Sequence, residues 1–123
     1  QAEVVLLDQP PIADGPAQRL VFCDMPCSGS GVWRRDPSGK WTLTAARLRD
    51  LQNLQSEILA QASALVAAGG LLLYATCSVL KRENSDQIDS FTADNPSWSC
   101  RDSKQFLPSN QGDGFYYAVL KKD

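Results

Sequence analysis

The sequence predicts an α/β fold in which two parallel strands are joined by a helix. Residues 20–24 (Leu-Val-Phe-Cys-Asp) are mainly apolar, with β-branched and aromatic side chains, which is typical of a buried strand. Residues 71–75 (Leu-Leu-Leu-Tyr-Ala) form a second such run, and a helical pattern lies between the two. A strand–helix–strand unit is right-handed and makes its strands parallel, so both carboxyl ends lie at one edge of the sheet. Open α/β sheets bind their ligands at that edge.

The composition indicates one globular domain. The chain has 123 residues, of which 43% are hydrophobic, enough for one core but not for two. No run approaches the length of a membrane span, and no signal pattern is present, so we expect a cytoplasmic protein. The net charge of −2 gives no global attraction to phosphates, so contact with nucleic acid requires a local basic patch.

The cysteine pattern argues against a zinc site and against a disulfide framework. The chain has no histidine and no C-x-x-C pair. It also lacks a secretory signal and the character of a small disulfide-rich protein. We therefore expect four free thiols and no bound metal.

The first part of the chain predicts a strand and an irregular segment. Residues 2–7 indicate a strand that ends at Asp8, followed by a loop rich in proline and glycine. Residues 32–41 are too irregular for a helix or a strand. Their basic and aromatic side chains could clamp a phosphate backbone and stack a base, or form a solvated loop with two packed tryptophans. They are Trp33, Arg34, Arg35, Lys40 and Trp41.

A long helix is expected from a cap at Thr42 or Thr44 to about Ala68, with Gly69 as its C-cap. Apolar residues recur there at spacings of three and four, so they form one stripe that packs against the sheet. They are Leu48, Leu51, Leu54, Ile58, Leu59, Ala62, Leu65 and Val66.

The last third of the chain predicts a short helix and an antiparallel strand pair. Residues 83–94 form an amphipathic pattern with Ile88 and Phe91 facing inward. Residues 98–103 indicate a weak strand, and residues 115–120 indicate a final strand that pairs with it.

The loop after the first buried strand, residues 24–31 (Asp-Met-Pro-Cys-Ser-Gly-Ser-Gly), is unusual. Pro26 has no N–H and ends the sheet ladder, and the two glycines allow close backbone approach. A carboxylate and a thiol, Asp24 and Cys27, remain at the strand tip. Cys77 follows the second strand in the same way, so we expect Cys27 and Cys77 to face one crevice.

A free cysteine is more often a small core residue than a nucleophile, and Cys23 and Cys100 are interpreted in that way. The sequence around Cys77 favours its thiolate form, because a helix begins a few residues later and Lys81 and Arg82 lie close in sequence.

Five motifs span nearly the whole chain. They are Asp-x-Pro-Cys-Ser-Gly-x-Gly at 24–31, Trp-Arg-Arg-x-Pro at 33–37, Leu-Gln-x-x-Ile-Leu at 54–59, Tyr-Ala-Thr-Cys-Ser at 74–78 with Glu-Asn at 83–84, and Gly-Asp-Gly-Phe-Tyr-Tyr-Ala at 112–118. Together they resemble the Sun (Fmu-type) family of RNA cytosine-C5 methyltransferases. The resemblance implies a Rossmann-like class I fold that transfers a methyl group from S-adenosylmethionine to cytosine C5 in RNA, most often ribosomal RNA.

The resemblance also implies which residues act. C5 of cytosine is a poor nucleophile, and a thiolate that adds to C6 turns the ring into an enamine that can take the methyl group. The family's nucleophile corresponds to Cys77. Cys27 corresponds to the cysteine that assists release after a base removes the C5 proton. Asp24 corresponds to the carboxylate that binds the cytosine edge.

The cofactor and RNA contacts follow from the same resemblance. S-adenosylmethionine would contact Asp8 on its adenine side, together with Asp24 and Pro26. The target base must be unstacked, or already in a loop, to enter the site. The expected RNA-binding residues are Arg34, Arg35 and Lys81.

The sequence departs from the family pattern at its beginning. The family's glycine-rich loop, the acidic residue that binds the ribose and the preceding RNA-binding region are absent. We therefore expect residues 1–123 to be the C-terminal portion of a catalytic domain, an incomplete fold with no second domain. Without two strands of that fold, the strand at 20–24 would expose an unpaired edge. The hypothesis is that the chain alone is inactive and self-associates.

Two other functions remain open. A methyltransferase acting on an amino nitrogen places an Asp-Pro-Pro-aromatic loop at the same strand tip, but amine methylation needs no thiol nucleophile. A non-catalytic RNA-binding or assembly module would use residues 33–35 and Lys81, and its activity would survive the loss of Cys77.

Overall fold

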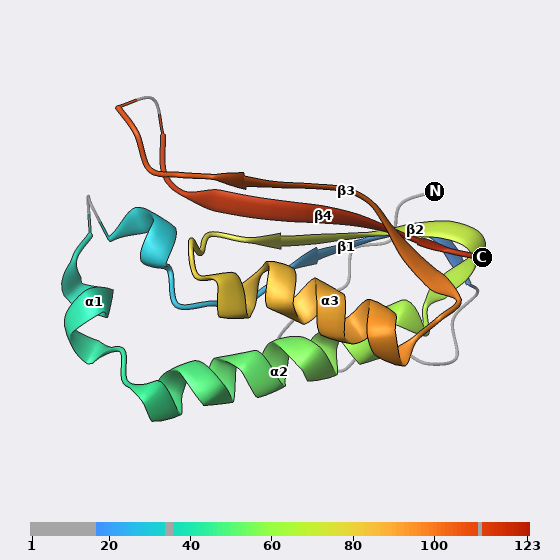
Figure 1. Ribbon diagram of the computed structural model, residues 1–123, viewed down its shortest axis with the longest axis horizontal. Helices are drawn as coiled ribbons and strands as arrows, with labels where there is room; N and C mark the ends of the chain where they lie inside the picture. The colour runs from blue at the N-terminus through green and yellow to red at the C-terminus, as the bar shows by residue number, and fades with distance from the viewer. Residues whose placement is uncertain (1–16, 34–35, 111) are drawn as a thin grey trace.

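A mixed sheet with two helices on one face forms the described part of the chain, which comprises residues 17–33, 36–110 and 112–123 of a computed structural model (Figure 1). The strands are β1 (Gln18–Asp24), β2 (Val66–Thr76), β3 (Trp98–Phe106) and β4 (Phe115–Lys122). The helices are α1 (Ser38–Thr42), α2 (Ala45–Ser63) and α3 (Ser85–Asp94), with short 3-10 turns η1 (Ser30–Val32) and η2 (Lys81–Glu83).

The strand order is β1-β2-β4-β3. β1 and β2 are parallel, with Leu20 opposite Leu71 and Asp24 opposite Ala75, and α2 connects them. This confirms the predicted strand–helix–strand unit. β4 runs antiparallel to both β3 and β2, which confirms the predicted C-terminal pair. The insertion of β4 between β2 and β3 was not predicted.

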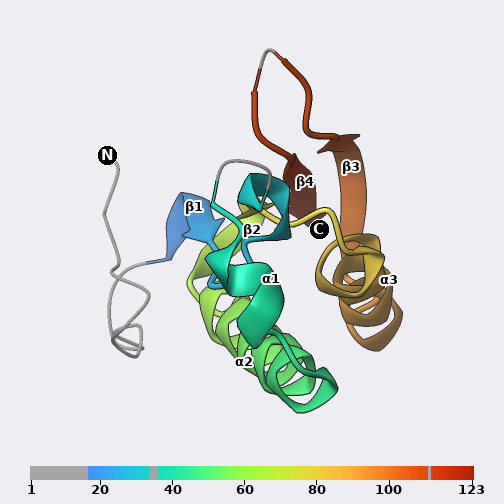
Figure 2. The same cartoon turned by 90° about the vertical axis from the view of Figure 1, so that its left-hand side faces the viewer.

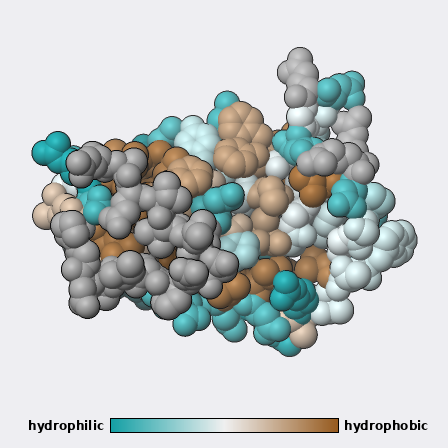
Figure 3. Space-filling view, turned by 180° about the vertical axis from the view of Figure 1, so that it is seen from behind, coloured by the Kyte–Doolittle hydropathy of each residue, from teal (hydrophilic) through white to brown (hydrophobic). Residues whose placement is uncertain are grey.

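The two faces of the sheet differ in their cover. Figures 1 and 2 show α2 and α3 on the same side, and Val21, Cys23 and Tyr74 are buried beneath them. Leu20 and Phe22 alternate with these residues, so they point to the other face, where they are 59% and 57% exposed. Hydrophobic surface is visible on the β1 side of the molecule (Figure 3). None of the described helices combines the length and the apolar character that a bilayer span requires.

Of the two caps predicted for α2, Thr42 and Thr44, the structure has Thr44, whose side chain accepts a hydrogen bond from the Arg47 backbone N–H at 3.1 Å. The predicted end of α2 was wrong, since α2 stops at Ser63 with Ala64 as its C-cap. The apolar pattern continues past that point because Val66 already belongs to β2.

Two further expectations about this region were wrong. Gly69 has a φ of +79°, but it lies within β2, where the register with β1 shifts, rather than at a helix end. Leu54 is 42% exposed, whereas Gln55 takes the buried position on the same helix. Residues 32–41 are also less irregular than expected, since they include most of α1. The strand predicted at 2–7 lies outside the described residues.

Candidate active site

The carboxyl ends of β1 and β2 bring two thiols together. The Sγ atoms of Cys27 and Cys77 lie 3.2 Å apart, although 50 residues separate them in the sequence. The Met25 N–H donates to the Ala75 carbonyl at 2.8 Å, and the Gly31 N–H donates to the Cys77 carbonyl at 2.9 Å. These two backbone hydrogen bonds fasten the loops on either side of the thiol pair. The predicted meeting of the two thiols is confirmed.

Glycines make this close approach possible. A Cβ atom on Gly31 would lie 2.2 Å from the Gly114 carbonyl oxygen and 2.7 Å from the Cys77 carbonyl oxygen. The Gly114 N–H also donates to the Gly31 carbonyl at 2.8 Å, which brings the segment before β4 to the same place. Gly29 has a φ of +72°, a conformation that other residues rarely adopt. Three segments therefore meet at the thiol pair.

The two thiols have different surroundings. Cys27 is half-buried, and burial, followed by the hydrogen bond with Cys77, raises the pKa of Cys27 to about 12. Cys27 is therefore protonated at neutral pH and can donate its hydrogen bond to the Cys77 sulfur. Cys77 is exposed, so an electrophile can reach it. All four cysteines are free. Cys23 lies in the core as expected, whereas Cys100 is exposed, so its interpretation as a core residue was wrong.

A buried carboxylate joins the two thiol loops, and the sequence analysis gave it no role. Glu83 is 0% exposed. It accepts hydrogen bonds from the Ser28 backbone N–H at 2.8 Å, from Ser28 Oγ at 2.7 Å, from Gln55 Nε2 at 3.2 Å and from Ser78 Oγ. Ser28 follows Cys27 and Ser78 follows Cys77, so one side chain contacts both loops.

Asn84 continues this polar network. Its amide nitrogen donates to the Ser78 carbonyl at 2.9 Å and to Gln105 Oε1 at 2.7 Å, and its oxygen accepts from Thr76 Oγ1 at 2.6 Å. Asn84 is 1% exposed, so these hydrogen bonds satisfy a side chain that has little contact with water. Two signals in the sequence pointed to the network: a glutamine within the apolar stripe of α2, and a Glu-Asn pair just before α3.

The other predicted site residues lie in varied places. Asp24, the last residue of β1, is exposed, and Pro26 is half-buried with its carbonyl accepting from Gln55 Nε2 at 2.8 Å. Asp8, Arg34 and Arg35 lie outside the described residues.

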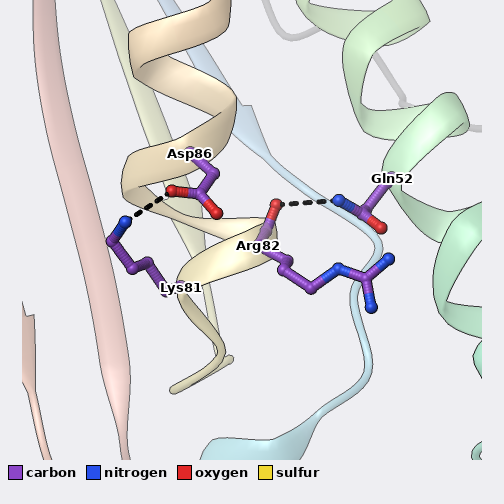
Figure 4. A network of polar contacts seen from close by, with 4 residues as sticks. All are labelled: Gln52, Lys81, Arg82 and Asp86. Carbon is purple, nitrogen blue, oxygen red and sulfur yellow. Dashed lines mark hydrogen bonds and ion pairs between the residues drawn. The ribbon is translucent and has the colours of Figure 1, made fainter.

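Near Cys77 in sequence, Lys81 has a carboxylate partner and Arg82 contacts α2 through its backbone. Lys81 Nζ pairs with Asp86 at 2.9 Å, and the Arg82 carbonyl accepts from Gln52 Nε2 at 3.4 Å (Figure 4). The Lys81 side chain is 77% exposed, so a phosphate could still reach it. The expected help from these cations in ionising Cys77 stays a prediction.

The two tryptophans of the segment at 32–41 differ. Trp33 is half-buried and lies beside Gly39, at which an added Cβ would be 3.1 Å from the indole nitrogen. Trp41 is 81% exposed, with Lys40 Nζ 5.9 Å from its ring centroid. Trp33 therefore fits the interpretation as a packed tryptophan, whereas Trp41 is accessible for stacking on an RNA base.

Comparisons with known proteins identify the family. The model of the 16S rRNA methyltransferase RsmB/F family matches residues 4–121. Ribosomal RNA small subunit methyltransferase B of Sodalis glossinidius is 40% identical, and the match covers 100% of this chain and 31% of that protein. The crystal structure of PH0851 superposes with a TM-score of 0.80 at 32% identity, over 85% of this chain and 26% of that chain.

A more distant structure shares the fold. NSun6 from Pyrococcus horikoshii, solved with SFG, has a TM-score of 0.70 at 21% identity, over 82% of this chain and 29% of that chain. The chain spans about a third or less of the length of these relatives. The predicted class is confirmed as part of a Rossmann-like methyltransferase fold, with parallel strands and a C-terminal antiparallel pair. The chain belongs to the RsmB/F (Sun) family of S-adenosylmethionine-dependent 16S rRNA methyltransferases.

Proposed function

We propose that this chain is the thiol-bearing portion of an enzyme that methylates cytosine C5 in ribosomal RNA through a covalent adduct with Cys77. Membership of the RsmB/F family supports RNA methylation. The observation that carries the covalent mechanism is the 3.2 Å distance between the sulfur atoms of Cys27 and Cys77. Methylation of an amino nitrogen gives no reason for two thiols to meet, so the distance favours C5 as the acceptor.

Cys77 is the nucleophile in this proposal because its sulfur is the exposed one. Its thiolate forms a bond to C6, and the C5–C6 π electrons become available at C5. When bound, S-adenosylmethionine would supply the methyl group to C5, with its sulfonium–methyl bond breaking so that S-adenosylhomocysteine is left. A base removes the C5 proton, and the electron pair of that C–H bond re-forms the double bond and expels the Cys77 thiolate.

Cys27 assists that last step. Because its pKa is raised to about 12, Cys27 keeps its proton at neutral pH. A protonated thiol 3.2 Å from the Cys77 sulfur can donate a hydrogen bond as negative charge returns to that sulfur. Cys27 therefore stabilises the Cys77 thiolate as it leaves C6. Because it stays protonated, Cys27 does not itself attack the cytosine.

The chain supplies only part of a cofactor site. Asp24 is exposed at the end of β1 and Pro26 lies beside it in sequence, so both can contact a ligand at this edge of the sheet. Asp8 would complete the set on the adenine side. The glycine-rich loop of the family is absent from the sequence, and we infer that the chain alone does not methylate RNA.

Single cysteine variants test the proposal in a chimera in which this chain replaces the matching segment of the Sodalis glossinidius relative. With RNA and S-adenosylmethionine, Cys27→Ala is expected to accumulate a covalent protein–RNA complex, because release is impaired. Cys77→Ala is expected to form none, and Cys100→Ala is the matched control that behaves as wild type. Gel electrophoresis under denaturing conditions detects the complex. A complex with Cys77→Ala but not with Cys27→Ala would exchange the two roles.

A further inference from the structure

The Glu83 carboxylate contacts both loops that carry the thiols. It is fully buried and sits in η2, between β2 and α3. The hydroxyls of Ser28 and Ser78 both donate to its Oε2 atom. The Ser28 N–H and Gln55 Nε2 donate to its Oε1 atom, at 2.8 and 3.2 Å. Each carboxylate oxygen thus accepts two hydrogen bonds, one or both of them from a serine side chain or backbone in the thiol loops.

The four donors come from three separate segments. Ser28 belongs to the loop after β1, Ser78 to the loop after β2, and Gln55 to the middle of α2. The backbone around Glu83 is held as well, since Tyr74 Oη donates to the Glu83 carbonyl at 2.5 Å. The carboxylate therefore cannot move without disturbing the residue that follows each thiol.

We propose that Glu83 is a positioning residue, which holds the Cys27 and Cys77 sulfur atoms in register through Ser28 and Ser78. This inference rests on the proposed use of the two thiols in methylation. Glu83 touches neither sulfur and takes no part in bond making. Hydrogen bonds to a carboxylate are stronger than neutral ones, which suits a contact that fixes two loops.

Binding of phenylarsine oxide tests whether the Cys27 and Cys77 sulfur atoms are held close together, and it needs neither RNA nor cofactor. Its arsenic forms bonds to two adjacent thiols, and the two thiol protons leave with the oxygen as water. In Glu83→Gln an NH2 group replaces one acceptor oxygen and the negative charge is lost, so the hydrogen bonds that remain to Ser28 and Ser78 are neutral ones. We expect the affinity of the Cys27–Cys77 pair for the arsenical to fall about tenfold, the effect of losing one hydrogen bond to a charged group. Glu57→Gln, an exposed position on α2, is the matched control and leaves the affinity unchanged.

The buried Cys23 separates positioning from general loss of structure. Cys23 is 1% exposed, so alkylation of Cys23 reports opening of the core. A tenfold weaker arsenical complex with Cys23 still protected supports the proposal. An unchanged affinity in Glu83→Gln overturns it. If Cys23 becomes reactive in Glu83→Gln, the arsenical affinity is measured in Ser28→Ala instead. That variant removes one hydroxyl donor to Glu83 and leaves Glu83 in place. Weaker binding with Cys23 protected then supports positioning, and unchanged binding excludes it.

The chimera links this inference to catalysis. There, Glu83→Gln is expected to lower kcat about tenfold while the KM for RNA stays unchanged, since the residue acts on the reacting thiols and not on RNA binding. A raised KM with unchanged kcat would contradict positioning. A chimera that methylates no RNA at all would contradict the proposed function. The arsenical measurement would still test the positioning role of Glu83.

Discussion

Cys23 and Cys27 lie four residues apart, yet their surroundings give them different chemistry. Cys23 points into the core beneath the helices, and burial alone raises its pKa to about 12. Cys27 has turned out of the strand to meet Cys77 and is only half-buried. The sequence allowed this distinction, because Cys23 lies within an apolar run and Cys27 follows a proline that ends the strand.

The raised pKa of Cys23 has a consequence for stability. The thiol ionises at 9.0 when unfolded and at about 12 when folded, so its contribution is complete below pH 9.0 and is lost as the pH rises toward 12. In that window the free energy of unfolding should fall by about 1.4 kcal/mol per pH unit for this group. Denaturant unfolding of wild type and Cys23→Ala across this pH range measures how much of the fall in the free energy of unfolding is due to Cys23. An equal pH slope in both proteins would show that Cys23 contributes nothing.

The hydrogen-bond partners of residues far apart in the chain could not be predicted from the sequence. The positions of Cys27 and Cys77 follow from strand order and chain direction, which local patterns reveal. The partners of Glu83 come from residues 5, 28 and 55 positions away, and no local pattern encodes which hydroxyl meets which carboxylate. A polar residue in an apolar stripe, such as Gln55, signals a network but does not identify its members.

At the scale of elements, periodicity predicted the strands and helices better than their ends or partners. The start of α2 was predicted to within two residues, at Thr42 or Thr44, because an N-cap is recognised from its own side chain, and Thr44 is the cap. Its end was misplaced because Leu65 and Val66 extend the apolar pattern of the helix while belonging to the next turn and strand. The place of β4 between β2 and β3 depends on pairing across the sheet, which its own sequence does not specify.

The junction of three loops beside the thiols depends on Gly31. Gly31→Ala would push a Cβ to within 2.2 Å of the Gly114 carbonyl, so the loop must shift. We expect a loss of about 2 kcal/mol in the free energy of unfolding, a usual cost of overpacking. Gly112→Ala is the matched control, since a Cβ there meets nothing within 4 Å. Denaturant unfolding compares the two, and equal stabilities would contradict the packing described for Gly31.

At the scale of the whole molecule, one face of the sheet carries no helix among the described residues. β1 is the edge strand of the described sheet, and Leu20 and Phe22 are more than half exposed. Exposed apolar side chains on an edge strand favour association. This agrees with a chain that spans 31% of its Sodalis relative.

We therefore propose that the isolated chain self-associates through this face. Leu20→Lys combined with Phe22→Lys should shift the mass measured by light scattering from a dimer or larger species to the monomer. Trp41→Lys, which removes a still more exposed aromatic side chain elsewhere, should leave the association unchanged. A wild-type chain that is monomeric at high concentration would rule this out.

The proposed covalent role of Cys77 is tested most directly with RNA that contains 5-fluorocytidine. The fluorine at C5 cannot leave as a proton, so an adduct formed by the chimera with S-adenosylmethionine cannot break down. Peptide mapping by mass spectrometry is expected to find the RNA attached to Cys77. Attachment to Cys27, or methylation without any attachment, would contradict the account.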